Sequence, residues 1–71
     1  MSNDYAHRIS QHQGIVEFTM VDGRKHVGRV VTCHSEGCAY VSDRFVFTIQ
    51  DHSGRRVELD SPHVLKVELD A

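Results

Sequence analysis

The chain has 71 residues, with eight lysines and arginines against ten aspartates and glutamates, so its formal net charge is −2 when histidine is neutral. This length fits one domain, residues 1–71. A balance this close to neutral excludes a uniformly basic nucleic-acid-binding surface but is compatible with a local basic patch. Because six histidines are present, full protonation would bring the charge to +4.

No segment of the chain reaches the roughly 20 apolar residues that a membrane span requires. The first residues contain no apolar run of the kind found in a signal peptide. Two cysteines in such a chain are expected to be free thiols in a reducing compartment. We therefore expect a cytoplasmic protein that makes no membrane contact and needs no cofactor.

Residues 1–13 predict a short N-terminal helix or a flexible arm. Ser2 or Asn3 can cap the helix, and Tyr5 and Ile9 share one face at a spacing of i,i+4. From Val16 to Met20 the apolar residues alternate with polar ones, which is typical of a half-buried strand.

Asp22-Gly23 predicts a tight hairpin turn, because both residues tolerate a positive φ. The return strand is expected from Arg24 to Cys33. Its alternation breaks at Gly28, where a glycine inside a strand predicts a bulge or a sharp bend.

Three more strands are expected at residues 45–50, 57–59 and 65–69, with a turn at 51–54 and a 3₁₀ turn at 61–63. The predicted core consists of Val16, Phe18, Met20, Val27, Phe45, Phe47, Ile49, Val57, Leu59, Leu65 and Val67. Five short strands with one apolar face bury that face best by curling into a small barrel.

This order of elements resembles the Sm-like branch of the SH3-like small β-barrels. The matching runs are VEFTMVDGRKHVGRVV (Val16 to Val31), FVFTIQD (Phe45 to Asp51) and VELDSPHVLKVEL (Val57 to Leu69). In that family a short N-terminal helix precedes five strongly bent strands, and a glycine bends the second strand. The resemblance therefore implies a mainly β, five-stranded Sm-like barrel.

Within that class the layout is similar to the Rof family, small bacterial proteins that bind the transcription terminator Rho and block it. Those proteins share the strand–DG–strand opening and the glycine-turn hairpin before a final strand. The resemblance implies a role in transcription regulation through contact with a protein.

The stretch VTCHSEGCAY holds Cys33, His34 and Cys38. These are zinc-ligand types, but tetrahedral zinc needs a fourth ligand that this stretch does not supply. The alternatives are a small zinc site, a cross-turn disulfide and a plain loop. Adjacent residues of a strand point to opposite faces, so Cys33 and His34 are poorly placed to share a proton in catalysis, and we expect no enzyme activity.

The connection from Thr32 to Asp43 is longer than the two to five residues of most hairpin loops. Long loops on a rigid scaffold often carry binding surfaces. We therefore expect this loop, with Tyr40 and Arg44 at its far end, to contact a partner.

Charged residues supply the remaining candidates for binding. Basic residues flank both turns, at Arg24, Lys25 and Arg29 and at Arg55 and Arg56, and are expected to gather on one rim. Acidic residues fall on the last two expected strands, at Glu58, Asp60, Glu68 and Asp70. If those strands pair, they form an acidic surface suited to a basic protein.

The leading hypothesis is a non-catalytic binding module that acts on the RNA and transcription machinery by protein contact, with Rho as one candidate partner. The competing hypotheses are an Sm-like ring that binds RNA directly and a small zinc-binding domain. The protein is expected to be a monomer or a small homo-oligomer.

Overall fold

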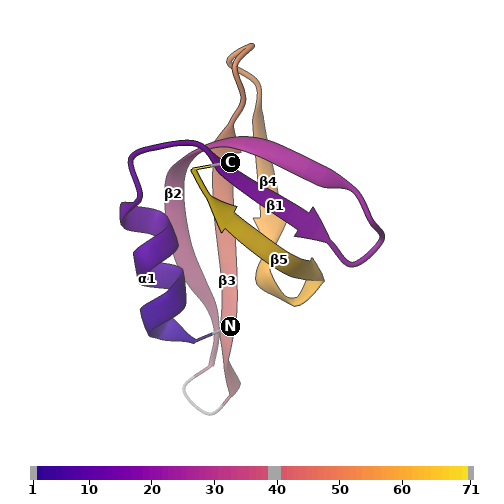
Figure 1. Cartoon of the computed structure of the whole chain (residues 1–71). Helices are drawn as coiled ribbons and strands as arrows, with labels where there is room; N and C mark the ends of the chain where they lie inside the picture. Colours follow the sequence, from indigo (N-terminus) through magenta and orange to yellow (C-terminus); the bar gives the residue numbers. More distant parts are fainter. Residues whose placement is uncertain (1, 39–40, 71) are drawn as a thin grey trace.

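A helix and five strands form the fold, and the computed structural model describes its backbone at residues 2–38 and 41–70 and its side chains at residues 2–36 and 44–70. The elements are α1 (Asn3–Gln11), β1 (Val16–Met20), β2 (Lys25–Cys38), β3 (Val41–Gln50), β4 (Arg56–Asp60), the 3₁₀ helix η1 (Ser61–His63) and β5 (Val64–Leu69) (Figure 1). All strand pairs are antiparallel, in the order β4-β3-β2-β1-β5. The prediction of a mainly β chain with five strands and one short helix is confirmed.

Helix α1 packs its apolar face against the sheet beside β2 (Figure 1). The hydroxyl of Ser2 caps the helix by accepting a hydrogen bond from a backbone N–H three residues on, at 3.2 Å. Ala6 and Ile9 lie one turn apart and are both buried in the core. Beyond the helix, His12 Nε2 lies 2.9 Å from Asp70 Oδ1, so the C-terminal end of α1 is held to the residue that follows β5.

The core lies between two halves of the bent sheet. Phe18 on β1 and Phe47 on β3 meet there, with ring centroids 5.3 Å apart and both side chains fully buried. Most of the predicted core is confirmed: the buried members are Val16, Phe18, Met20, Phe45, Phe47, Ile49 and Leu59. Val57 and Val67 are partly buried against them.

The assignment of Val27 to the core is wrong, because its side chain is 48% exposed. The register of β1 with β2 places His26 opposite Phe18, so His26 shares the inner face. Val27 lies opposite Glu17 and therefore faces outward. Because the alternation of apolar and polar residues breaks near Gly28, the sequence pattern did not show that His26, and not its neighbour Val27, faces the core.

The assignment of Leu65 to the core is also wrong, because its side chain is 69% exposed. Thr19 pairs with Lys66, but Met20 pairs with Val64, so Leu65 is the additional residue of a β-bulge. The bulge turns Leu65 outward and leaves Val64 partly buried.

The long loop expected from Thr32 to Asp43 is wrong as well. Strand β2 continues to its end at residue 38, and β3 begins at residue 41. The extended strands remain in register, with Ser35 opposite Phe45 and Glu36 opposite Arg44. The two oppositely charged side chains lie 3.7 Å apart and favour this pairing.

Strand β2 belongs to both halves of the sheet because it bends at Gly28. Up to Gly28 it pairs with β1, and from Arg29 onward it pairs with β3, where Arg29 lies opposite Gln50. A Cβ atom at Gly28 would lie 2.5 Å from the carbonyl oxygen of Gln50. Val31 is then left as the additional residue of a bulge, since Val30 and Thr32 pair with consecutive residues of β3. The predicted bend at Gly28 is thus confirmed.

The two edges of the sheet are β4 and β5, and no described residue of one pairs with the other. The 3₁₀ helix η1 joins these two strands, and hydrogen bonds fix it to the β1–β2 turn and to β3. The Val21 N–H donates to the His63 carbonyl at 2.8 Å, and the Phe45 N–H donates to the Ser61 hydroxyl at 2.9 Å. Closure of the sheet into a barrel therefore stays a prediction.

Replacement of Gly28 by alanine tests the close approach of β2 to the end of β3. The new methyl group must displace backbone atoms of Gln50, so we expect Gly28→Ala to lower the free energy of unfolding by about 1–3 kcal/mol. Urea denaturation measures the difference, with the exposed Val27→Ala as the control, expected within about 0.5 kcal/mol of the wild type. A Gly28→Ala protein as stable as that control would contradict the proposed bend.

Candidate binding groove

Two adjoining hollows lie between the first part of β2 and the turn that joins β3 to β4. The first has a volume of about 560 Å³ and is lined by Ile15, Val27, Gly28, Arg29, Gln50, Asp51 and His52. The second has a volume of about 300 Å³ and is lined by Lys25, His26, Val27, Ile49, Asp51, His52, Arg55 and Val57. They share Val27, Asp51 and His52, so we treat them as one site, the basic groove.

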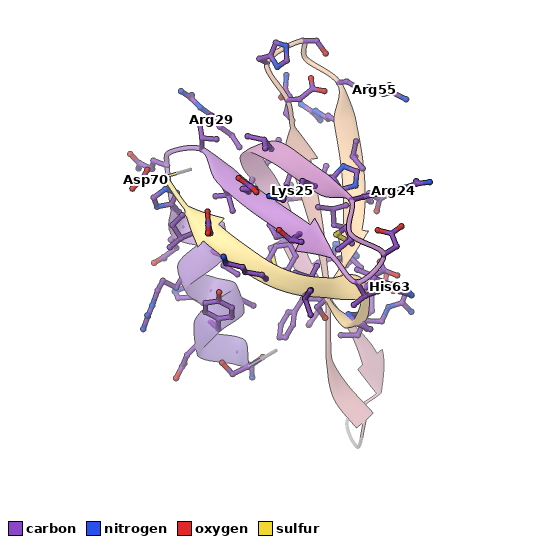
Figure 2. All side chains as sticks on the ribbon, turned by 45° about the vertical axis from the view of Figure 1, so that its right-hand side comes forward. Arg24, Lys25, Arg29, Arg55, His63 and Asp70 are labelled. Atoms are coloured by element: carbon purple, nitrogen blue, oxygen red, sulfur yellow. The ribbon has the colours of Figure 1, made fainter. Side chains whose placement is uncertain are left out.

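Three of the predicted basic residues border this groove. Arg29 belongs to the first hollow, and Lys25 and Arg55 belong to the second. Figure 2 labels Lys25 on the first part of β2, Arg29 just after the bend at Gly28, and Arg55 on the neighbouring hairpin. The three basic residues thus border adjoining hollows, because the bend at Gly28 brings the start of β2 beside the β3–β4 turn.

The charges of the groove are only partly balanced. Lys25 Nζ lies 3.4 Å from Oε1 of the half-buried Glu17, whereas no carboxylate of a described residue is within ion-pair distance of Arg29 or Arg55. The lining residues include one carboxylate, that of Asp51. The groove therefore has a net positive charge even with its two histidines neutral.

Asp51 organises the β3–β4 turn. Its Oδ1 accepts hydrogen bonds from the Ser53 hydroxyl at 2.6 Å, the Ser53 N–H at 2.9 Å and the Arg55 N–H at 3.0 Å. The bond from the Ser53 hydroxyl is the main cause that lowers the pKa of Asp51, and the two backbone donors act in the same direction. Gly54 completes the turn with a φ of 88°, which favours glycine. The turn thus presents His52 and Arg55 from a well-bonded backbone.

The first part of β2 turns an unpaired backbone edge toward the groove. The Met20 N–H donates to the Arg24 carbonyl at 2.7 Å, which sets the alternation of hydrogen bonds in the β1–β2 ladder. The backbone N–H and C=O groups of His26 consequently form hydrogen bonds with β1. Those of Lys25 and Val27 point to the opposite side of β2, away from β1. Among the described strands none pairs with that side of β2 before Arg29.

The other predicted basic residues lie outside the groove lining. Arg24 occupies the β1–β2 turn, with Nε 3.5 Å from Asp22 Oδ2. Arg56 is exposed at the start of β4, opposite Gln50. Arg44 lies on β3, and its hydrogen bond to Asp60 is the main cause that raises its pKa. Tyr40 lies outside the described residues.

The predicted acidic surface is wrong, because β4 and β5 lie at opposite edges of the sheet and do not pair. Cationic or imidazole groups also engage three of its four members. These contacts are Arg44–Asp60 at 2.6 Å, Lys66–Glu68 at 2.7 Å and His12–Asp70 at 2.9 Å. Only the exposed Glu58 of β4 has no described ion-pair partner.

The first cysteine and its neighbouring histidine face opposite sides of β2. Cys33 lies opposite Phe47 and packs against the core, and burial raises the pKa of its thiol. His34 faces outward, with Nε2 3.1 Å from Glu36 Oε1. The side chain of Cys38 lies outside the described residues. Among the described side chains, no three histidine, cysteine, aspartate or glutamate residues cluster as metal ligands would.

Sequence reasoning missed His26, His52 and the apolar lining residues Ile15 and Val27. The positions of His26 and Val27 could have been found by pairing the residues on either side of the Asp22-Gly23 turn, which gives the register of the first hairpin. No local signal marks His52, because the turn that carries it reaches β2 only through the pairing of β2 with β3.

No protein-family model, curated protein or solved structure matches the chain. In the part of the chain that the structure describes, no helix is long and apolar enough to cross a membrane.

A pH titration of stability tests the role of Asp51. Its pKa is lower in the folded chain than in the unfolded one, so its contribution is present above the ordinary carboxylate range, near pH 4, and is lost as the pH falls through the folded pKa. We expect Asp51→Asn to be less stable than the wild type at neutral pH and to lose less stability on acidification. Urea denaturation at neutral and acidic pH measures both. Parallel pH profiles would contradict this role.

Proposed function

We propose that this chain is a non-catalytic binding module of the RNA and transcription machinery and that it acts by contacting a protein, as a Rof-like inhibitor of Rho does. The single observation that carries the choice of protein contact is the character of the basic groove. It combines unpaired cations, apolar lining residues and a free strand edge, and its described lining includes no phenylalanine, tyrosine or tryptophan.

The order of the elements supports the resemblance to Sm-like proteins, from which we take the proposed kind of partner. A short helix, five antiparallel strands, a glycine bend in the second strand and a 3₁₀ turn before the last strand follow one another in the order expected for an Sm-like chain. We propose that the bent sheet is an Sm-like small barrel and that the protein works in the cytoplasm, with the transcription apparatus.

Direct RNA binding is the competing function. Proteins that bind single-stranded nucleic acid usually combine basic residues with aromatic side chains on which bases stack. All three phenylalanines of this chain are buried in the core. The free edges of β4 and β5 favour the ring alternative, since neighbouring subunits can pair such edges.

Capture from a bacterial lysate treated with nuclease tests the proposal. The immobilised chain is expected to retain a protein of the RNA or transcription machinery, and purified Rho is then tested for binding in the same format. Retention should survive the nuclease. Gel filtration of the free chain is expected to give the mass of a monomer or small oligomer.

Three results would contradict the proposal. Retention that disappears with nuclease, combined with RNA affinity that falls steeply with salt, would identify an RNA-binding protein. Elution at several times the monomer mass together with such RNA binding would identify the ring. Stoichiometric zinc whose removal by a chelator unfolds the chain would identify the zinc-binding domain.

A further inference from the structure

We infer that the basic groove receives an acidic, extended segment of the partner, which adds as a short strand to the free edge of β2 at Lys25 and Val27. This inference rests on the proposed function, because it takes the partner to be a protein. It assigns the contact to one place in the fold and gives the chemistry of the segment that fits there.

The backbone of β2 supplies the first argument. The N–H and C=O groups of Lys25 and Val27 point toward the groove, and β3 pairs with β2 only from Arg29 onward. An incoming extended segment can satisfy these groups with the hydrogen bonds of an additional strand. The turn after β3 keeps the described chain itself from continuing along this edge.

The charge of the groove supplies the second argument, because it determines the sign of the segment. Arg29 and Arg55 stand at the two hollows without a described carboxylate within ion-pair distance, and Lys25 is paired with Glu17 alone. Asp51 contributes one negative charge, which its three hydrogen bonds stabilise, so the two arginines outnumber it and the groove remains positive. A segment that carries carboxylates complements this arrangement, whereas a basic segment meets repulsion.

The apolar lining supplies the third argument. Val27 is 48% exposed and Ile15 is 36% exposed in the first hollow, and the partly buried Val57 lines the second. Alternate side chains of an added strand point to opposite faces, so apolar residues of the segment can cover these surfaces while carboxylates reach the arginines. Both hollows have volumes within the range of about 300–1,000 Å³ that is usual for ligand sites.

The other edges of the sheet fit an acidic strand less well. The bulge at Leu65 interrupts the edge of β5, and bulges of this kind weaken strand addition. The edge strand β4 carries Glu58 beside Arg56, and its Asp60 is paired with Arg44, so this edge has no excess of positive charge. The edge at Lys25 and Val27, in contrast, is bordered by two arginines without described ion pairs and by only one such carboxylate, that of Asp51.

Fluorescence anisotropy with a labelled peptide of alternating glutamate and valine tests the inference directly. The peptide is expected to bind the wild-type chain, whereas a peptide with lysine in place of glutamate is expected not to bind. Methylation of the peptide's backbone nitrogens leaves its side chains in place but removes its strand hydrogen bonds, and we expect it to abolish binding. A single-stranded RNA of similar length serves as the nucleic-acid probe.

Adjacent arginines provide a matched pair of variants. Arg55→Gln and Arg29→Gln are expected to weaken peptide binding about fivefold each, which is the effect of about 1 kcal/mol for a partly exposed charge pair. Arg56→Gln, one residue along the chain and outside the groove lining, should bind as the wild type does. All three positions are exposed, so circular dichroism should report an unchanged fold.

Several outcomes would overturn the inference. Equal losses for Arg55→Gln and Arg56→Gln would show that the site is only a diffuse charge effect. Unchanged binding of the methylated peptide would exclude strand addition. RNA binding in the groove without peptide binding would exclude a protein ligand there. If the groove variants keep full capture of the partner from lysate, this site is wrong while the proposed function stands.

Discussion

The close contact between Gly28 and the backbone of Gln50 is the constraint on which the rest of the structure depends. Only a residue without a side chain lets β2 pass the end of β3 at this distance, because a Cβ would meet the Gln50 carbonyl oxygen at 2.5 Å. This passage allows one strand to pair first with β1 and then with β3. The two halves of the sheet can therefore enclose a core in which Phe18 meets Phe47. A short chain has little other means of burying its apolar face.

The same bend creates the basic groove, since a strand that changes partners leaves part of its edge unpaired. Most charged residues elsewhere are engaged in local pairs, such as Arg44 with Asp60 and Lys66 with Glu68. These exposed pairs neutralise surface charge, and the bond between Lys66 and Glu68 lowers the pKa of that carboxyl. The arginines of the groove are exceptions among the described residues. A chain with an acidic net charge can thus present a local site for an acidic partner.

Local signals in the sequence were sufficient for the elements and for most of the core. The Asp22-Gly23 turn, the alternation from Phe45 to Ile49 and the bend at Gly28 were all predicted correctly, because each carries a local signal in the sequence. The errors arose where pairing between distant segments decides the outcome. The bulge at Leu65 is set by the register with β1, and the predicted acidic surface required β4 and β5 to be neighbours. The basic residues were predicted individually, but the position of three of them along the groove depends on the bent sheet.

Amide hydrogen exchange along the first part of β2, measured by NMR on the free chain, tests the central claim most directly. The claim is that this segment pairs with β1 on one side and leaves its other side open. It predicts slow exchange at His26 and Gly28, whose N–H groups bond to β1, and fast exchange at Lys25 and Val27. Equally slow exchange at all four amides would contradict the account, because it would mean that the edge facing the groove is already paired.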